Sequence, residues 1–196
     1  MASHILRRAH AADIPVLARL HIEAWRETYD GWMPADVLAN LDPTDWEARW
    51  RTQMSVAATD PAHAVFLALD ASGQPAGFGA CRRQTSQKLL PLGYDAEIVS
   101  LYLLRRIQGQ GVGRRLVLEM SSHLIAHGCR ACGFWVFRDS LGARDFYERL
   151  GAAPTGVEGV WEIFGMTLPD MAYGLRDLQS LKASRGSSLH LSDARR

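Results

Sequence analysis

The distribution of apolar and polar residues is most informative between residues 97 and 137. Residues 97–103, EIVSLYL, are rich in β-branched and large apolar residues and predict a strand. From Val112 to Leu124 apolar residues recur every three or four positions, which is the spacing of one helix face. The almost continuous apolar run within Cys129–Phe137 predicts a strand buried on both faces. This order predicts a βαβ unit with a parallel strand pair.

The residues before this unit predict a set of alternating helices and strands. Residues 83–95 lose apolar periodicity, so we expect them to form a mobile loop at the rim of a substrate site. The predicted elements are a strand at 4–8, a helix with Asp13 as its N-cap, a short helix near Pro34, a helix opened by the capping box Thr44-Asp45-Trp46-Glu47, and a hairpin of strands 64–69 and 75–82.

After residue 137 the pattern predicts a helix over 141–150, ended by Gly151, and one closing strand over 161–168. The chain then becomes polar and rich in small residues, so we expect a disordered C-terminal tail at 179–196 after one domain at 1–178. The predicted fold class is α/β, with a mixed sheet that has a central parallel strand pair and is flanked by helices.

Composition restricts the classes of partner. The chain has 196 residues, of which 47% are hydrophobic and 22% charged, and these proportions fit one soluble domain. A formal net charge of +1 argues against a broad surface for nucleic acid or acidic membrane. No apolar run approaches the roughly 20 residues that span a bilayer, and MASHILRR lacks the apolar core of a signal peptide. With only three cysteines, we expect a cytoplasmic protein.

A glycine-rich turn joins the central strand to the central helix, with the sequence Gln108-Gly109-Gln110-Gly111-Val112-Gly113. Alternating glycines let the backbone approach a ligand closely. The following helix offers unpaired N–H groups and the positive end of its dipole. The turn therefore predicts an anion site, for which phosphate is the most plausible ligand.

Other glycine-rich motifs fit this turn less well. A P-loop requires Gly-Lys-Ser/Thr, whereas Arg114 and Arg115 follow Gly113. The dinucleotide motif is G-x-G-x-x-G with an acidic residue about 20 positions later, and here Cys132 or Gly133 stands at that distance. A purely structural explanation, in which the glycines permit tight strand-to-helix packing, stays open.

Several spaced motifs together resemble the GNAT superfamily of acetyl-CoA-dependent N-acetyltransferases. The glycine turn matches the family signature Gln/Arg-x-x-Gly-x-Gly/Ala at each fixed position. The resemblance covers residues 4 to about 178. Its other carriers are the opening strand and helix from Ile5 to Asp13, the strand Leu101-Tyr102-Leu103, and the block Ala143-Arg144-Asp145-Phe146-Tyr147-Glu148-Arg149-Leu150-Gly151, which is similar to the family's A-x-x-F-Y-E-x-x-G.

The resemblance implies a binding mode for coenzyme A. The pyrophosphate would lie on the backbone N–H groups of residues 108–113 with Arg114 near the phosphates, and the pantetheine arm would run beside Leu101–Leu103. A backbone N–H there would stabilise the oxyanion that forms on the thioester carbonyl. The sequence departs from the family at Arg105, where proline is common, and at Ser140, where an asparagine often contacts the cofactor.

The resemblance also implies catalytic roles. The amine must lose a proton before it attacks, and the departing thiolate should gain one. Glu97 begins the central strand, where some family members place a general base. A strand-end carboxylate in solvent or a structural hydrogen bond is an equally good explanation. Tyr147 stands where the family commonly has the general acid that protonates the thiolate. We expect Glu148 to face solvent.

Aromatic residues at helical spacing mark a possible acceptor site. His21, Trp25 and Tyr29 lie at i, i+4 and i+8 and share a helix face. In the GNAT family the corresponding helix borders the acceptor pocket, so Trp25 and Tyr29 are candidate substrate-binding residues. Core packing is the commoner explanation for aromatic residues at this spacing.

A metal or redox site is a weaker alternative. Cys129 and Cys132 form a CxxC motif, and His123 and His127 precede it. The motif follows the end of a helix, which does not favour a thiolate. We therefore expect no metal, and Cys132 is more simply explained as core filling.

The resemblance therefore implies an N-acetyltransferase that moves an acetyl group from acetyl-CoA to a primary amine in a ternary complex. The acceptor would be a small molecule or a peptide, with no nucleic acid and no membrane as partner, and a homodimer is possible. The alternatives are a CoA-binding sensor or partner protein without turnover, and transfer of another acyl group.

Overall fold

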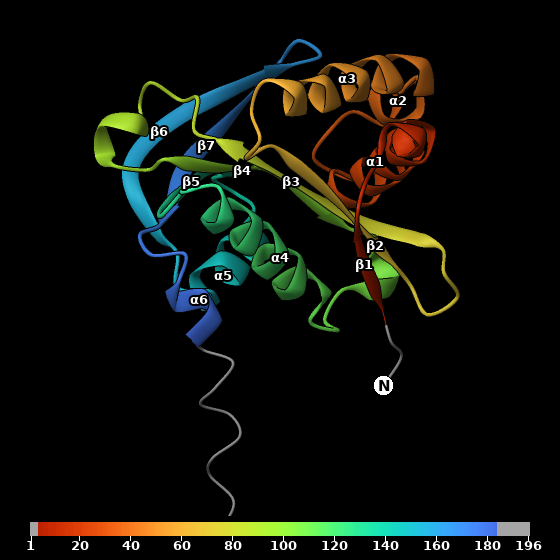
Figure 1. Cartoon of the computed structure of the whole chain (residues 1–196). Helices are drawn as coiled ribbons and strands as arrows, with labels where there is room; N and C mark the ends of the chain where they lie inside the picture. The colour runs from red at the N-terminus through yellow and green to blue at the C-terminus, as the bar shows by residue number, and fades with distance from the viewer. Residues whose placement is uncertain (1–3, 184–196) are drawn as a thin grey trace, which may run out of the picture. The chain divides into compact units, whose positions relative to one another are not determined.

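The computed structural model describes residues 4–183. They form two compact units, one made of residues 4–83 and 98–120 and the other of residues 84–97 and 121–183. The chain passes from the second unit to the first within β4 (Ala96–Leu103) and returns within α4 (Val112–Ala126), both labelled in Figure 1. These two elements are the strand and the helix that the apolar pattern predicted.

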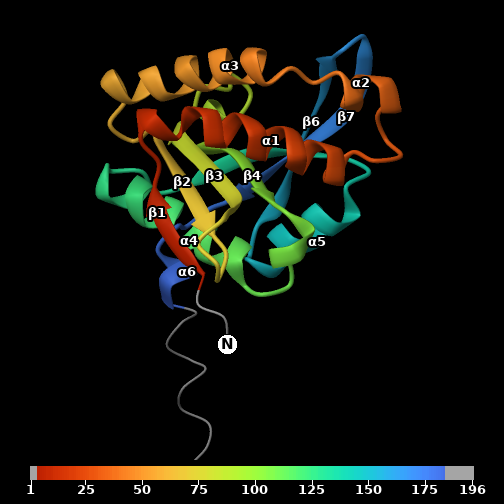
Figure 2. The ribbon, with the colours of Figure 1, turned by 90° about the vertical axis from the view of Figure 1, so that its right-hand side faces the viewer.

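The first unit combines antiparallel strands with two long helices. Its strand order is β1-β2-β3-β4, and α1 packs against β3 and lies beside α3 (Figure 1, Figure 2). Besides its parts of β4 and α4, its elements are β1 (Ile5–Arg8), η1 (Ala11–Asp13), α1 (Ile14–Thr28), α2 (Ala35–Ala39), α3 (Pro43–Ser55), η2 (Val56–Ala58), β2 (Ala64–Leu69), β3 (Pro75–Arg83) and η4 (Arg105–Ile107).

The predicted hairpin is confirmed, because β2 and β3 pair antiparallel. β2 is buried along almost its whole length, as the apolar sequence AVFLAL requires. The turn between the strands is organised by Asp70, whose Oδ1 accepts hydrogen bonds from the N–H groups of Ser72 and Gln74, both at 3.0 Å. A short acidic side chain that bonds its own turn in this way fixes where the hairpin reverses.

The start of α1 lies where the sequence placed it, but Asp13 does not cap the helix with its side chain. Its carboxylate instead accepts two hydrogen bonds from the Arg7 guanidinium, at 2.8 and 2.6 Å, and one from the His10 N–H at 2.8 Å. The hydrogen bond from Arg7 is the main reason why the pKa of Asp13 falls to about 2. Asp13 therefore joins β1 to the entrance of α1.

The predicted capping box at the start of α3 is wrong. The N-cap is Asp42, whose carboxylate accepts a hydrogen bond of 2.8 Å from the Thr44 N–H. The physical reason is Pro43, because proline favours the first helical position, where its fixed φ fits and its missing N–H costs nothing. The helix therefore begins at Pro43, two residues earlier than it would with Thr44 as its N-cap.

The second unit contains the parallel strand pair. β4 pairs in parallel with β5 at Ala96↔Cys132 and Glu97↔Gly133, which confirms the predicted pair. Its strand order is β4-β5-β7-β6, and β7 runs antiparallel to both of its neighbours. Besides its parts of β4 and α4, its elements are η3 (Leu90–Leu92), β5 (Cys132–Phe137), α5 (Leu141–Arg149), β6 (Ala153–Ile163), β7 (Met166–Leu175) and α6 (Ser180–Ala183).

Over the described residues the fold class is therefore the predicted one, a mixed α/β fold with seven strands, a parallel pair and flanking helices. The single closing strand over 161–168 is wrong, because Phe164 and Gly165 form a turn that separates β6 from β7. Their φ angles are 50° and 73°, as a two-residue turn between twisted antiparallel strands demands. Only Gly165 signals this turn, and phenylalanine at the first position conceals it.

The segment 84–95 is more firmly packed than a loop at a site rim was expected to be. Leu89 and Tyr94 are buried and belong to a core cluster with Ala131 and Ala172. The Gln84 amide is also buried, and its Nε2 donates to the carbonyls of Ala96 and Gly133, each at 3.1 Å. The segment is thereby fixed to the start of the parallel pair.

The start of the predicted tail lies within the described residues. Residues Ser180–Ala183 form the short helix α6 there, and Leu181 is buried. The rest of the predicted tail, residues 184–196, lies outside the described residues. Over residues 4–183, no helix has the length and apolar character that crossing a membrane requires.

The packing of Tyr94 makes Gly174 in β7 irreplaceable. A Cβ at Gly174 would lie 2.0 Å from the Tyr94 hydroxyl oxygen, so we expect Gly174→Ala to destabilise the fold by about 1–3 kcal/mol. The unfolding midpoint should fall by roughly 2–4 °C per kcal/mol. Thermal unfolding measures this, with Gly142→Ala in α5 as the control because no atom lies within 4 Å of its added Cβ. Equal midpoints for the two variants would contradict the packing.

Candidate functional site

The glycine turn has the backbone conformation that only glycine adopts freely. Gly109 and Gly111 have φ angles of 69° and 76°, in the left-handed region. A Cβ added at either residue would meet no atom within 4 Å, so tight packing does not explain these two glycines. Gly113 follows in the first turn of α4. The conformation of the turn is thus the feature that requires glycine.

Two glutamine side chains brace this turn. Gln108 Nε2 donates to the Leu103 carbonyl and Gln110 Nε2 to the Arg106 carbonyl, each at 2.8 Å. The Arg115 N–H donates to the Gly111 carbonyl at 3.1 Å, which begins the hydrogen bonding of α4. The first N–H groups of a helix have no partner within it, so the turn presents donors and a positive dipole end to an anion.

The strand that leads to the turn carries Leu101, Tyr102 and Leu103, each partly buried. β3 approaches this strand closely at Gly77, where a Cβ would lie 2.4 Å from Leu103 Cδ2. The Tyr102 hydroxyl lies 2.7 Å from the Tyr29 hydroxyl. Burial raises the pKa of Tyr102, and hydrogen bonds with Tyr29 and Trp25 offset part of that rise. Tyr102 is therefore a neutral phenol at physiological pH.

Trp25 and Tyr29 belong to a larger set of aromatic residues. Both are buried, with exposed fractions of 2% and 4%, so core packing accounts for most of their surface. Sequence spacing placed His21 of α1 beside them, but it could not reveal the members that come from α3, β3 and β4. We call the set the aromatic cluster, and its members are His21, Trp25, Tyr29, Trp46, Trp50, Phe78 and Tyr102.

His21 lies at the centre of the aromatic cluster. Its ring lies 4.2 Å from the Trp46 ring and 4.7 Å from the Phe78 ring, centroid to centroid. Its Nδ1 is covered and has no hydrogen-bond partner among the described residues. Burial, together with the positive charge of Arg49, lowers the pKa of His21 to about 3. The imidazole is therefore neutral at physiological pH.

Glu97 lies at the start of the parallel pair, opposite Gly133 of β5. It is 9% exposed, and the Thr85 hydroxyl donates to its Oε2 at 3.4 Å. The solvent-exposed strand end that the sequence allowed is thus excluded, whereas both a structural and a catalytic role remain compatible with a buried, hydrogen-bonded carboxylate. Thr85 was missed because it belongs to a segment without any periodic pattern.

Tyr147 lies on α5 and is 8% exposed. Its ring packs against Phe134 with a centroid distance of 4.3 Å. The next residue, Glu148, is exposed as predicted, and its Oε1 also accepts a hydrogen bond of 2.6 Å from the buried Tyr173 hydroxyl. Arg144 Nε donates to the same hydroxyl at 3.1 Å. These two contacts hold α5 to β7 on either side of Tyr147.

The remaining predicted cofactor residues lie at helix starts. Ser140 is at the N-cap position of α5, but its side chain makes no capping hydrogen bond. Arg114 is in the first turn of α4 and is partly exposed. The glycine turn, Arg114 and the strand Leu101–Leu103 belong to the first unit, while Glu97, Ser140 and Tyr147 belong to the second.

The cysteines and histidines considered for a metal have other neighbours. Cys129 and Cys132 are both buried, and Cys129 Sγ lies 3.9 Å from the Asp95 carbonyl oxygen. His127 Nδ1 lies 2.8 Å from the His123 carbonyl oxygen. Within residues 4–183, no three His, Cys, Asp or Glu residues are grouped so that they could hold a metal ion.

The mixed sheet with a parallel pair, and the left-handed glycine turn that opens a helix, are the features that the resemblance to GNAT acetyltransferases led us to expect. Residues 19–152 match the model of the acetyltransferase (GNAT) family. The chain is 30% identical over 177 residues to the uncharacterized N-acetyltransferase YuaI of Bacillus subtilis (strain 168), and the match covers 90% of this chain and 95% of YuaI.

Solved structures share the fold. The PaiA N-acetyltransferase of Thermoplasma acidophilum, in complex with coenzyme A, matches with a TM-score of 0.63 and 18% identity over 87% of this chain and 98% of that one. YncA of Salmonella typhimurium, a putative acetyltransferase with acetyl-CoA, matches with a TM-score of 0.64 and 18% identity over 89% of this chain and 94% of that one.

The chain therefore belongs to the GNAT acetyltransferase family. The predicted activity, acetyl-CoA-dependent N-acetyl transfer, and the predicted cosubstrate acetyl-CoA are confirmed at the level of this family. The family acts on small-molecule or peptide acceptors.

The lowered pKa of His21 makes stability depend on pH. In the unfolded chain this histidine is protonated below about pH 6.5, whereas in the folded chain it is protonated only below about pH 3. Above pH 6.5 it is neutral in both states, so it does not lower the free energy of unfolding there. As the pH falls from 6.5 toward 3, the free energy of unfolding should drop by up to about 1.4 kcal/mol per pH unit from this group.

Denaturant unfolding of the wild type and His21→Phe between pH 4 and pH 8 measures this contribution. We expect the difference in free energy of unfolding to change only below pH 6.5, with the wild type losing more. A difference that stays constant over the whole range would show that His21 is not the neutral, buried group described.

Proposed function

We propose that this protein transfers the acetyl group of acetyl-CoA to a primary amine of a small-molecule or peptide acceptor, by direct attack within a ternary complex. The observation that carries the proposal is the left-handed backbone at Gly109 and Gly111 directly before α4. Backbone N–H groups of residues 108–113 would hold the pyrophosphate, with Arg114 close to the phosphates. The proposed N-acetyltransferase domain spans residues 1–178.

The pantetheine arm would run beside Leu101, Tyr102 and Leu103, where it can use backbone groups of β4. One strand N–H in this region would stabilise the oxyanion that develops on the thioester carbonyl. Ser140 would contact the cofactor through its hydroxyl. Support comes from the partial exposure of the three strand residues and from the absence of a capping bond at the Ser140 hydroxyl.

Proton transfer is assigned to Glu97 and Tyr147. The amine nitrogen bonds to the thioester carbon as the carbon–sulfur bond breaks. Glu97 takes the proton that the amine must lose, directly or through water, and Tyr147 gives its phenolic proton to the leaving sulfur. The assignment is supported by the hydrogen bond from Thr85 to Glu97 and by the packing of Tyr147 on Phe134, which restrict both side chains.

Trp25 and Tyr29 are proposed to border the acceptor site. Tyr29 is the better supported of the two, because its hydroxyl lies 2.7 Å from that of Tyr102 on the strand proposed for pantetheine. A hydroxyl pair can give and take hydrogen bonds with a polar acceptor. Trp25 would act mainly by packing beneath this pair, at a ring-centroid distance of 5.2 Å from Tyr29.

Two alternatives compete with turnover of acetyl groups. A CoA-binding sensor or partner protein would keep the glycine turn but show no turnover, and an enzyme for another acyl group would keep the same catalytic residues. Neither has an observation in its favour beyond those already used. We further propose a cytoplasmic location, no nucleic-acid or membrane partner, no metal and a homodimeric assembly.

Ligand-dependent unfolding tests the cofactor site. At about 100 times its dissociation constant, a specific ligand stabilises by about 2.7 kcal/mol, which at about 2–4 °C per kcal/mol is a shift of several degrees. We expect this shift with acetyl-CoA and CoA but not with ATP. The matched control is Gly111→Ala, which strains the left-handed residue without adding a contact. An equal shift with ATP, or none with acetyl-CoA, would contradict the proposal.

Two conservative substitutions test the catalytic roles. Tyr147→Phe and Glu97→Gln should each lower kcat by about 10²–10⁴-fold, while the dissociation constant for acetyl-CoA changes by less than about threefold. The loss in Glu97→Gln should shrink at high pH, because the free amine then needs no base. Steady-state kinetics by thiol release measures both, and Tyr94→Phe is the control for loss of a buried tyrosine hydroxyl.

Unchanged turnover in either variant would remove that residue from the mechanism. A wild-type protein that binds acetyl-CoA but acetylates no primary amine in a broad panel would favour the sensor.

A further inference from the structure

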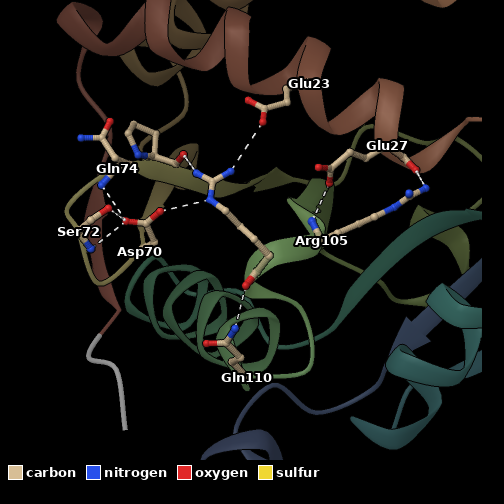
Figure 3. A network of polar contacts seen from close by, with 9 residues as sticks. Glu23, Glu27, Asp70, Ser72, Gln74, Arg105 and Gln110 are labelled. Atoms are coloured by element: carbon tan, nitrogen blue, oxygen red, sulfur yellow. Dashed lines mark hydrogen bonds and ion pairs between the residues drawn. The ribbon is translucent and has the colours of Figure 1, made fainter.

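Two consecutive arginines, Arg105 and Arg106, occupy the 3₁₀ helix η4 between β4 and the glycine turn. Figure 3 shows the polar contacts in this region, which reach from α1 to the turn between β2 and β3. Neither arginine belongs to the signature of the glycine turn. What they contact suggests a role in holding the turn in place.

Arg106 links three separate parts of the first unit. Its Nε lies 3.2 Å from Asp70 Oδ2 and its Nη2 donates to the Pro75 carbonyl at 2.8 Å, both in the β2–β3 hairpin. Its Nη1 lies 3.7 Å from Glu23 Oε1 on α1. Its own carbonyl accepts the 2.8 Å hydrogen bond from Gln110, the residue between the two left-handed glycines.

Asp70 is a firm anchor for this arginine. Its other carboxylate oxygen, Oδ1, already accepts from the Ser72 hydroxyl at 2.6 Å and from two backbone N–H groups at 3.0 Å. These bonds, of which the one from the Ser72 hydroxyl contributes most, act together with the hydrogen bond from Arg106 to lower the pKa of Asp70 to about 2. The carboxylate is therefore ionised and oriented before it meets the guanidinium.

Arg105 makes a second attachment, to the last turn of α1. Its backbone N–H donates to Glu27 Oε2 and its Nη2 donates to the Glu27 carbonyl, both at 2.6 Å. The N–H of Arg105 is therefore used, and a proline at this position would have none to offer. Helix α1 and the hairpin thus hold two consecutive residues of the short segment that leads into the glycine turn.

Glycines gain nothing from side-chain packing and have more backbone freedom to lose than other residues. A turn rich in glycine therefore loses more conformational entropy when a ligand orders it, and this loss weakens binding unless neighbouring residues already hold the turn in place. We propose that Arg106, acting through Gln110 and anchored by Asp70, is a positioning residue that sets the affinity for acetyl-CoA. This inference rests on the proposed cofactor role of the glycine turn.

The test is calorimetric titration of the full chain with acetyl-CoA, followed by steady-state kinetics. Arg106→Ala should raise both the dissociation constant and KM for acetyl-CoA about fivefold, with kcat within about twofold, because only positioning is lost. Gln110→Ala should produce a similar rise, and the double variant should show no further rise because both act along one path. Arg106→Lys should recover part of the affinity.

The matched control is Arg51→Ala, which removes an exposed ion pair of 2.7 Å with Glu47 on α3 of the same unit. It should leave the affinity unchanged. Thermal unfolding identifies variants that fail to fold, and Gln110→Ala, which removes one exposed side-chain bond, keeps the test decisive if Arg106→Ala fails.

Two negative results differ in meaning. Wild-type affinity in Arg106→Ala or Gln110→Ala, beside loss of binding in Gly111→Ala, would overturn the positioning role alone. Failure of the wild type to bind acetyl-CoA would overturn this inference together with the proposed function.

Discussion

The left-handed backbone at Gly109 and Gly111 is the constraint on which the candidate site depends. It allows the chain to leave β4 and enter α4 within a few residues, so that the first N–H groups of the helix stay available. A conformation of this kind does not hold itself, because glycine has no side chain with which to pack. The surrounding structure supplies what is missing through Gln108, Gln110 and the arginines of η4. The site is thus a flexible sequence held by less flexible neighbours.

Local patterns predicted the elements around this turn correctly and failed where two local rules competed. The strand before the turn and the helix after it have long, regular apolar periods, and no nearby signal contradicts them. At α3 the capping box pointed to Thr44, but Pro43 fixed an earlier start with Asp42 as the cap. Phe164 is a bulky residue that adopts a positive φ, which bulky residues disfavour. The sequence therefore predicted one continuous strand, whereas the structure has a turn between β6 and β7. Both failures concern ends of elements, where single residues decide.

Only those site residues were predictable that the local sequence identifies by itself. The glycines indicate a left-handed turn, and the order of motifs identified Tyr147 and Glu97 as candidate catalytic residues, whose roles stay predictions. The hydrogen-bond partners of site residues could not be predicted in this way. Tyr29 and Tyr102 are hydrogen-bonded although 73 positions separate them in the sequence, and Tyr173 and Glu148 are separated by 25. Such contacts arise from strand order and helix packing, which no local period contains. The same reason explains why the aromatic cluster looked like a stripe of three residues.

Arg105 shows how a departure from a family pattern can be explained physically. Where proline is common, the backbone needs no hydrogen-bond acceptor at that position, because proline has no N–H. An arginine has a backbone N–H that needs a hydrogen-bond acceptor and a guanidinium that can donate further hydrogen bonds. Glu27 accepts from both, because its carboxylate accepts from the N–H and its backbone carbonyl accepts from the guanidinium. The rigidity that a proline ring supplies by restricting φ is here supplied by a contact with α1. Arg105 and Glu27 therefore act as a pair, and the effect of a substitution at either residue depends on the other.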